Sequence, residues 1–248
     1  MIRLVRDLDP TDPPFGLALD EALLEGVRAG GEDTVRLWVN DRVVVIGRSQ
    51  ALASEVDLKE AERLAIPVIR RISGGGAVYH HPGNLNVSLY VSDSRPIGGV
   101  EEAFRLIGSA IAAGLSELGI DVQPDGNRLM CADKKIGGAA QARRGSALLY
   151  HTTLIVRPDP IPMERLLCAL RPGYSTSAVP SHPFRTTSLS EIIEKGLSLA
   201  DVGGAALKGI VRLIGRPAVE GGLSAEEGAR ARELLFEKYG RDGWNRQR

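Results

Sequence analysis

The sequence has no long apolar run, few cysteines, few aromatic residues and no excess of charge. No run approaches the ~20 apolar residues that span a bilayer, and the first residues lack the apolar segment of a secretory signal. We therefore expect a cytoplasmic protein without a membrane partner. An aromatic content of 4% and a formal net charge of zero argue against a nucleic-acid surface, so we expect no nucleic-acid partner. Cys131 and Cys168 lie far apart, in neither a disulfide nor a zinc-site pattern.

Common catalytic motifs are also missing from the sequence. It contains no G-x-x-x-x-G-K-[ST] phosphate loop, no G-x-G-x-x-G turn, no G-x-S-x-G elbow and no H-E-x-x-H pair. The four histidines have no metal-ligand spacing, so the ligands of any metal stay unidentified. The chemistry must therefore come from less general patterns.

The order of apolar patterns predicts the fold class. A chain of 248 residues can form one large domain with one hydrophobic core. Apolar spacing predicts helices over residues 15–28, 56–64, 98–120, 161–170, 188–195, 203–215 and 224–239. Strand patterns cover residues 34–50, 66–73, 84–91 and 128–156, the first as a hairpin that turns at Asn40-Asp41. This order is not a regular βαβ alternation, so we expect an α+β fold with a mixed, largely antiparallel central sheet flanked by helices.

The first segment that indicates chemistry is "RRISGGGAVYHHPGN", residues 70–84. Three consecutive glycines after an apolar strand indicate a backbone that bends sharply or approaches a ligand closely, although a plain tight turn is the common reason for a glycine pair. Exposed N–H groups beside fixed cations favour an anion site. Strand alternation puts Arg71 and Ser73 on one face and Arg70 on the other. We therefore assign ligand contact to Arg71 and a structural or peripheral role to Arg70.

The second segment is "DKKIGGAAQARRG", residues 133–145. A lysine pair in a turn is usually a solvated surface feature. Here Lys135 is followed at once by an isoleucine and four glycine or alanine residues, and this run of small residues leaves room for a ligand against the backbone.

Together these segments resemble the catalytic domain of the lipoate–protein ligase A family, relatives of biotin protein ligases and octanoyltransferases. The resemblance continues through "LALDEALL", "LWVNDRVVVIGRSQ", "RTTSLSEI" and "EKYGRDGWN". It implies the fold of the biotin/lipoate ligase catalytic domain, with residues 1–248 as a single catalytic domain and no C-terminal accessory domain. Because two-domain members of the family carry that accessory domain, a separate accessory ligase subunit is an expected partner.

The resemblance also implies a two-step reaction. Lipoate and ATP, with Mg²⁺, form lipoyl-AMP, and the lipoyl group then passes to a lysine of a lipoyl carrier domain. Such carriers are the E2 component of a 2-oxoacid dehydrogenase and the H protein of glycine cleavage. Joining a carboxylate to an α-phosphate brings two anions together, so the site must neutralise charge where the phosphorus reacts. Lys135 is the implied catalytic cation between them.

Other site residues follow from the same resemblance. The implied contacts with ATP and the acid come from Arg71, Ser73, Gly74, Gly75, Gly76, Ala77, Val78, Tyr79, Asn84, Gly137, Ala139 and His151. For the apolar lipoyl tail, Leu37, Trp38 and the small residues after Lys135 are candidate walls.

Two other functions compete with the ligase. An octanoyl- or lipoyltransferase would take its acyl group from a carrier or a preformed adenylate, and the octanoyl type uses a cysteine nucleophile. Cys131 shares strand parity with Lys135 if the turn keeps register, but its "LMCA" context is typical of an ordinary strand interior. A non-catalytic carrier-docking subunit is the other alternative. Lys135 and the glycine loop argue against it, because mere docking has no need of a cation beside an exposed backbone.

Overall fold

The computed structural model describes residues 1–193 and 196–247, and within them the strands form one sheet of eight strands and a second of three. The large sheet has the order β11 (Ala218–Glu220), β1 (Ile2–Thr11), β2 (Thr34–Asn40), β6 (Asn84–Val91), β10 (Ala147–Ile155), β9 (Lys134–Arg144), β8 (Arg128–Cys131) and β7 (Gln123–Asp125). The small sheet has the order β4 (Val68–Arg70), β3 (Val43–Ile46) and β5 (Val78–His80).

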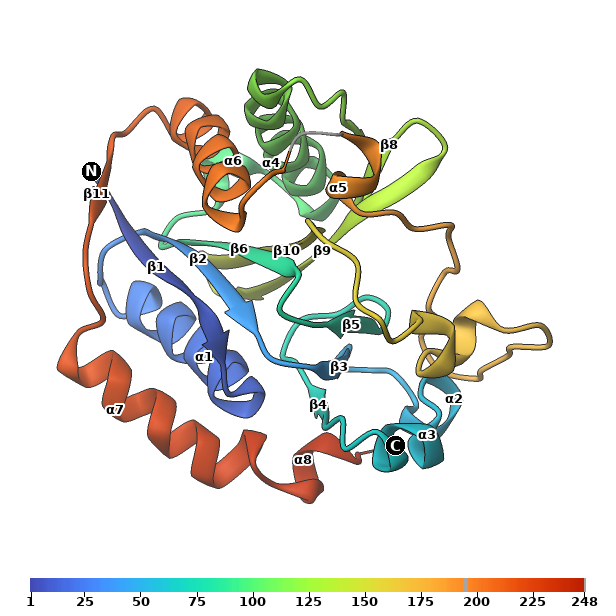
Figure 1. Ribbon diagram of the computed structural model, residues 1–248. Coiled ribbons are helices and arrows are strands. Elements are labelled where there is room, and N and C mark those ends of the chain that lie inside the picture. The colour runs from blue at the N-terminus through green and yellow to red at the C-terminus, as the bar shows by residue number, and fades with distance from the viewer. Residues whose placement is uncertain (194–195, 248) are drawn as a thin grey trace.

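Pairing in the large sheet is mostly antiparallel. Strand β1 pairs in parallel with β11 and β2, whereas β2, β6, β10, β9, β8 and β7 pair antiparallel in succession. Helices cover both faces of this sheet (Figure 1). The expected α+β class, with a mixed and largely antiparallel sheet flanked by helices, is confirmed.

The helices pack in two layers. Helices α4 (Val100–Leu115) and α6 (Leu199–Ile214) lie on one face of the large sheet, while α1 (Pro13–Arg28) lies on the other with α7 (Ala225–Leu234) outside it (Figure 1). Short helices α2 (Leu52–Glu55) and α3 (Leu58–Arg63) flank the small sheet, and α5 (Leu189–Ile192) and α8 (Asp242–Asn245) follow later in the chain. No helix among the described residues is long and apolar enough to cross a membrane.

Most of the predicted long helices are present at the expected positions. The helix over 98–120 is α4, which ends in a 3₁₀ turn over Ser116–Leu118 and a left-handed Gly119. A capping box begins α7, where Ser224 and Glu227 bond reciprocally. The regular helix over 161–170 is wrong, since that stretch contains only two 3₁₀ turns, Met163–Arg165 and Cys168–Leu170. Part of the helix expected over 188–195 forms α5, and residues 194–195 lie outside the described residues.

The predicted hairpin at Asn40-Asp41 is wrong. Both strands exist, but β2 lies inside the large sheet with β1 and β6 on its two edges, so neither edge is free for β3. Strand β3 instead pairs with β4 and β5 in the small sheet. Local sequence predicts strands and turns, whereas the partner of each strand depends on segments far away.

The prediction of one hydrophobic core is also wrong, because the buried apolar side chains form three clusters. One lies between the large sheet and α4 and α6, a second lies between the opposite face and α1, and a third surrounds the small sheet. Strand β6 shows why the first two are separate. Its Leu85, Val87 and Leu89 belong to the first cluster, whereas Tyr90, of opposite parity, belongs to the second.

Candidate active site

A cavity opens where the two sheets meet. Counting its open mouth, it encloses about 1310 Å³ of empty space, enough for a ligand of the size of a nucleotide with an acyl chain. Both segments singled out in the sequence contribute to its wall. The residues expected at the site that line it are Arg71, Gly76, Ala77, Val78, Tyr79, Asn84, Lys135, Gly137, Ala139 and His151. Ser73, Gly74 and Gly75 belong to the same loop but do not line the cavity.

The position of Lys135 depends on a β-bulge. Along β9, Gly137 pairs with Leu129 of β8, but the next pair is Lys135 with Met130, so Ile136 is an extra residue. Ile136 therefore packs in the first hydrophobic cluster, and Lys135 turns into the cavity. With regular alternation these two side chains would exchange faces.

The ammonium of Lys135 has no carboxylate within salt-bridge distance among the described residues. It lies 2.9 Å from the point where a Cβ of Gly138 would be, so the missing side chain of this glycine leaves room for it. Burial, and then the charges of Arg128 and Arg71, lower the pKa of Lys135. A partly desolvated cation without a counter-ion gains most from a bound anion. Neighbouring Lys134 is exposed.

Arg71 holds the glycine loop in shape. Its guanidinium donates to the carbonyl oxygens of Gly74 (2.5 Å) and Gly76 (2.8 Å), to that of Val45 (3.3 Å), and to the hydroxyl of Ser73 (2.9 Å). Four of the five N–H donors of an arginine are thereby used inside the protein. Burial lowers the pKa of Arg71 to about 10, which leaves it charged at neutral pH. Its main contact is therefore with the loop backbone, and at most one N–H is left for a phosphate.

The two adjacent arginines have different surroundings. Arg70 is fully buried away from the cavity and donates to the carbonyl oxygens of Gly47 and Gln50 (both 2.9 Å) and to main-chain oxygens near the C-terminal α8. Alternation of the strand therefore separates the two side chains, as the sequence indicates.

A chain of hydrogen bonds links the glycine loop to α1. The Ser73 hydroxyl lies 2.7 Å from Nε2 of His151, whose Nδ1 lies 2.8 Å from the carboxylate of Asp20. Burial by itself raises the pKa of Asp20, but the hydrogen bond and charge of His151 and the charge of Arg36 outweigh it and lower the pKa. Both ring nitrogens of His151 are occupied, so this side chain offers the cavity its ring surface. Asp20 was not predicted; its only signal was a carboxylate inside the apolar "LALDEALL".

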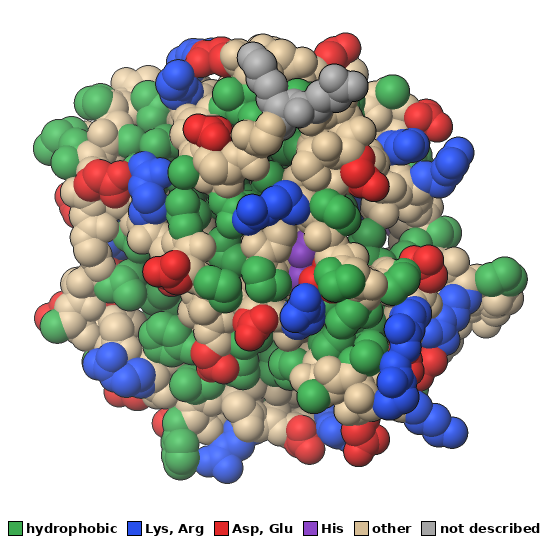
Figure 2. All heavy atoms as spheres, viewed as in Figure 1, with side chains coloured by type: hydrophobic (Ala, Val, Ile, Leu, Met, Phe, Trp, Pro, Cys, Tyr) green, Lys and Arg blue, Asp and Glu red, His purple; other side chains and the backbone are tan. Residues whose placement is uncertain are grey.

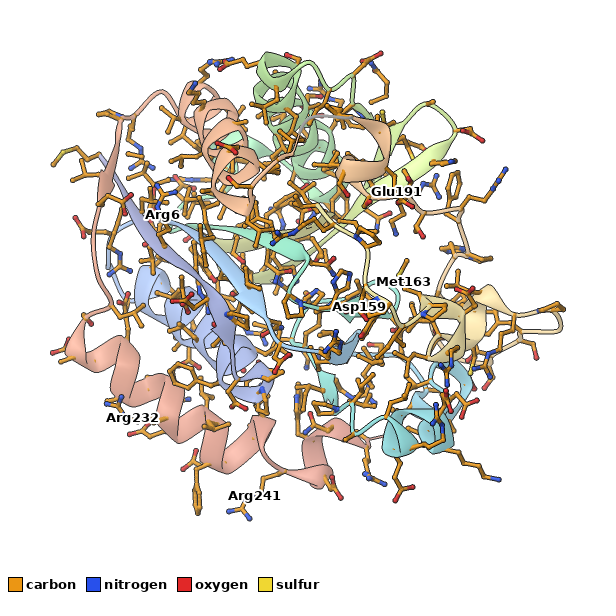
Figure 3. The ribbon with its side chains drawn as sticks, viewed as in Figure 1. Arg6, Asp159, Met163, Glu191, Arg232 and Arg241 are labelled. Atoms are coloured by element: carbon orange, nitrogen blue, oxygen red, sulfur yellow. The ribbon has the colours of Figure 1, made fainter. Side chains whose placement is uncertain are left out.

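Strands β5 and β6 position the residues that are expected to contact the nucleotide. Asn84 donates from Nδ2 to the carbonyl oxygen of Tyr79 (3.0 Å), and the Tyr79 hydroxyl donates to Asp159 (3.2 Å). Asp159, labelled in Figure 3, also accepts two hydrogen bonds from Arg42. Tyr79 therefore cannot swing out without breaking a buried contact, and Ala77, Val78 and Tyr79 form one continuous wall.

One of the candidate walls for an apolar tail is wrong. Trp38 lines the cavity together with Leu17 and Val45, but Leu37 packs in the first hydrophobic cluster on the opposite face of the sheet. Adjacent residues of β2 cannot face the same side. Residues at the cavity that the sequence did not indicate include His80, Asn86, Arg128, Thr153, Ser181 and Phe184.

Neither cysteine lines the cavity. Cys131 pairs with Lys134, so its side chain shares a face of the sheet with Lys134 and not with Lys135. It packs against the first hydrophobic cluster. The expected shared parity with Lys135 is therefore wrong, because the two-residue turn at Ala132-Asp133 places Cys131 opposite Lys134 and Met130 opposite Lys135. Burial, with a smaller effect of Asp121, raises the pKa of the Cys131 thiol, so it is a weaker nucleophile than a free cysteine.

The cavity offers no ligand set for a metal. Its described lining contains no aspartate or glutamate, and no group of three or more metal-ligating side chains occurs in the part of the chain that the structure describes. Mg²⁺ is normally held by one or two protein carboxylates and by phosphates. The residues present do not fit a protein-held Mg²⁺, and we derive no step through one.

Comparison with known proteins identifies the family. The model of the lipoyl protein ligase A/B catalytic domain matches residues 12–211, and the chain therefore belongs to this family. A lipoate-protein ligase A of Aeropyrum pernix is 35% identical over 94% of this chain and 88% of its own length. Lipoate-protein ligase A subunit 1 of Thermoplasma acidophilum is 29% identical over 95% and 93%. Octanoyltransferase LipM of Symbiobacterium thermophilum is 28% identical over 94% and 93%.

Solved structures have the same fold. A lipoate protein ligase from T. acidophilum with bound lipoic acid superposes with a TM-score of 0.85 at 29% identity, covering 99% of both chains. A lipoate-protein ligase A bound with ATP gives 0.85 at 30% identity, covering 99% of this chain and 98% of the other. A bi-partite lipoate protein ligase and its E2 lipoyl domain, also from T. acidophilum, gives 0.84 at 28%, covering 100% and 97%.

Proposed function

We propose that this protein is the catalytic subunit of an ATP-dependent lipoate–protein ligase. Family membership and relatives named as lipoate-protein ligases support an enzyme of this class. One observation carries the specific chemistry: the half-buried ammonium of Lys135, with no carboxylate within salt-bridge distance among the described residues, faces a glycine loop across a cavity with an apolar inner wall. Structures of similar proteins hold lipoic acid in one case and ATP in another, which supports these two substrates.

In the first step a carboxylate oxygen of lipoate attacks the α-phosphorus of ATP, and pyrophosphate leaves. Lys135 lies between the two anions and stabilises the charge that develops on the reacting phosphate. Its ammonium contributes position and charge, with no covalent step on the lysine itself. The glycine loop, shaped by Arg71, lets the phosphate approach the backbone.

In the second step the neutral amine of a carrier lysine attacks the acyl carbon of lipoyl-AMP. The bond from that carbon to the phosphate oxygen breaks, and AMP leaves with release of the amine proton. The acceptor is a lipoyl domain of an E2 component or an H protein; the E2 lipoyl domain that accompanies a similar bi-partite ligase supports the first of these. No step depends on a metal held by the chain.

The proposal includes a separate accessory subunit for the activation step. A relative that matches almost end to end is named subunit 1 of its ligase, and a similar ligase is bi-partite. We further propose that residues 1–248 act as one catalytic unit, since β11 pairs with β1 and α8 bonds to β4. A cytoplasmic location fits a reaction that consumes ATP in a protein whose two cysteines are free.

The thiol-dependent transferase fits the cavity less well. Octanoyltransferases occur among the relatives, but no described residue that lines this cavity is a cysteine. A purely docking role gives no reason to bury a lysine without a counter-ion.

The test is direct transfer to a carrier. The protein is mixed with lipoate, ATP, Mg²⁺ and a lipoyl domain, with and without an accessory subunit, and the carrier is weighed by mass spectrometry. A second arm supplies synthetic lipoyl-adenylate in place of ATP and lipoate. We expect a lipoyl adduct on the carrier lysine in the second arm in all cases. Failure of both arms in every mixture would overturn the proposal.

A further inference from the structure

Glu55 is a fully buried carboxylate that no cation contacts within the described residues. It ends α2 and does not line the cavity. Its Oε1 accepts a hydrogen bond from the hydroxyl of Tyr174, and its Oε2 accepts one from the hydroxyl of Ser181 at 2.6 Å. Burying a charge is costly unless polar partners surround it. The two hydroxyls stabilise the buried carboxylate by donating hydrogen bonds to it.

The same two hydroxyls also accept hydrogen bonds. Oγ of Ser181 accepts from the backbone N–H of Ala77 (2.8 Å) and from Nε2 of Gln50 (3.0 Å), and the hydroxyl of Tyr174 accepts from the N–H of Ser181 (3.0 Å). Each hydroxyl therefore has its single proton directed at Glu55 and its lone pairs directed elsewhere. Only a side chain with two acceptor oxygens satisfies this arrangement, and a carboxylate has them.

This network joins two parts of the cavity wall that are far apart in the sequence. Residues 174–187, which we call the roof segment, contribute Ser181 and Phe184 to the lining, and Ala77 contributes from the glycine loop. The fit at the contact is close, since a Cβ on Gly76 would lie 2.9 Å from Oγ of Ser181. Further along, the roof segment reaches Lys135, whose N–H donates to the carbonyl oxygen of Arg185 (2.8 Å).

We propose that Glu55 is a positioning residue that fixes the roof segment over the glycine loop and so sets the affinity of the cavity for the acyl-adenylate. It acts through Tyr174 and Ser181 without touching the ligand. The identity of this ligand rests on the proposed function, whereas the effect on the roof segment does not.

The experiment compares Glu55→Gln and Tyr174→Phe with Glu62→Gln, a control at an exposed position of α3. The first readout is trypsin cleavage after Arg185, whose side chain is 80% exposed in the roof segment, relative to cleavage after Arg28, which is exposed at the end of α1. The second is the dissociation constant of a non-hydrolysable lipoyl-adenylate analogue, by calorimetry. The third is the ratio of kcat to KM for transfer from synthetic lipoyl-adenylate.

For Glu55→Gln we expect the ratio of the two cleavage rates to rise about 10-fold and the analogue to bind about 10- to 100-fold more weakly, the usual cost of leaving a buried polar group without its partner. KM should rise while kcat changes less than about 3-fold, because Lys135 is untouched. Tyr174→Phe should act in the same direction, and the double variant should add little to the larger single effect. Glu62→Gln should behave as the unchanged protein.

Equal acceleration of cleavage at Arg185 and Arg28 would indicate general loosening and overturn the proposal. Unchanged cleavage and unchanged affinity in Glu55→Gln would overturn it as well. If Glu55→Gln fails to fold, Tyr174→Phe, which removes one hydroxyl alone, decides the outcome by the same readouts. If the unchanged protein itself fails to bind the analogue, the proposed function fails, and the ratio of cleavage rates still decides the role of Glu55.

Discussion

The floor and the roof of the cavity are built in different ways. The floor consists of β6, β10 and β9, whose register is set by a continuous ladder of backbone hydrogen bonds. The roof consists of the glycine loop and the roof segment, to which buried side chains make hydrogen bonds. Arg71 binds three carbonyl oxygens there, and Glu55 binds two hydroxyls. One buried cation and one buried anion thus fix the conformation of the roof, as the ladder of backbone hydrogen bonds fixes that of the floor.

The difference separates two kinds of effect. A change on the floor removes a reacting or neutralising group but leaves the ladder intact. A change in the roof leaves that group in place but alters the shape in which a ligand is held. Charges on the outer surface show no comparable organisation, since both signs are interspersed over the face shown in Figure 2. The following changes, in decreasing order of expected effect, test the separation.

Removing the floor cation should have the largest effect. Lys135→Ala should lower the rate of adduct formation on a lipoyl domain at least ~100-fold, the usual loss when a donor that stabilises transition-state charge is removed. Lys134→Ala, at the exposed neighbouring position, should change it less than about 2-fold. Mass spectrometry of the carrier over time measures both. Equal losses in the two variants would show that the cavity-facing position has no special role.

Arg71→Lys should weaken the roof. A lysine has three donors on one nitrogen and cannot reach the three carbonyl oxygens and Ser73 together, so buried acceptors lose partners. We expect about 2–4 kcal/mol less stability in urea unfolding and weaker binding of lipoyl-adenylate. The matched control is Arg63→Lys at an exposed ion pair, where the change should stay below about 0.5 kcal/mol. Identical unfolding curves for the two variants would refute the assigned role of Arg71.

The contact between the small sheet and the large sheet should weaken in acid. His80 of β5 bonds to Thr153 of β10 at 2.8 Å and to Asn40 of β2 at 3.0 Å, and burial lowers its pKa to about 3. The unfolded chain takes up this proton near pH 6.5, well before the folded protein does. Stability is therefore fully present above that pH and is lost as the pH falls toward 3, by about 2 kcal/mol at pH 5.

Urea midpoints between pH 7.5 and 5 measure this loss. His80→Gln should flatten the dependence, although buried His81, whose pKa burial lowers to about 4, will keep part of it. His182→Gln, at an exposed position, should leave the dependence unchanged. A slope that persists in full in His80→Gln would mean that other groups control the acid limb.

The smallest effect should come from the cysteines. Cys131→Ser and Cys168→Ser should each change the transfer rate less than about 2-fold, because neither thiol lines the cavity. The assay is transfer from synthetic lipoyl-adenylate. A large loss in Cys131→Ser, in protein that is still folded, would instead support a transferase that uses a cysteine nucleophile.

The floor was more predictable from sequence than the roof. Alternation along 84–91 and the spacing along 98–120 gave β6 and α4, because both patterns are local. The bulge that turns Lys135 inward has no local signal, and the shared parity expected for Cys131 failed because the turn after β8 pairs Cys131 with Lys134. The pairing of 43–46 failed for a similar reason, since β3 finds its partners in segments that follow later.

The site shows the same limit. The glycine loop and Lys135 were recognisable because unusual residue types occur together in short segments. Glu55 and Ser181 are 126 residues apart, and only the fold brings their side chains into contact. Their individual residue types are ordinary, and no spacing rule connects them.

The ammonium of Lys135, which we propose as the catalytic cation, lies in the space that a side chain at Gly138 would fill. Since the side chain that Gly138 lacks would end 2.9 Å from Nζ of Lys135, a methyl group at this position would push the ammonium elsewhere. A protein with the same lysine, glycine loop and fold could therefore lose its activity through the gain of a single carbon atom at this glycine.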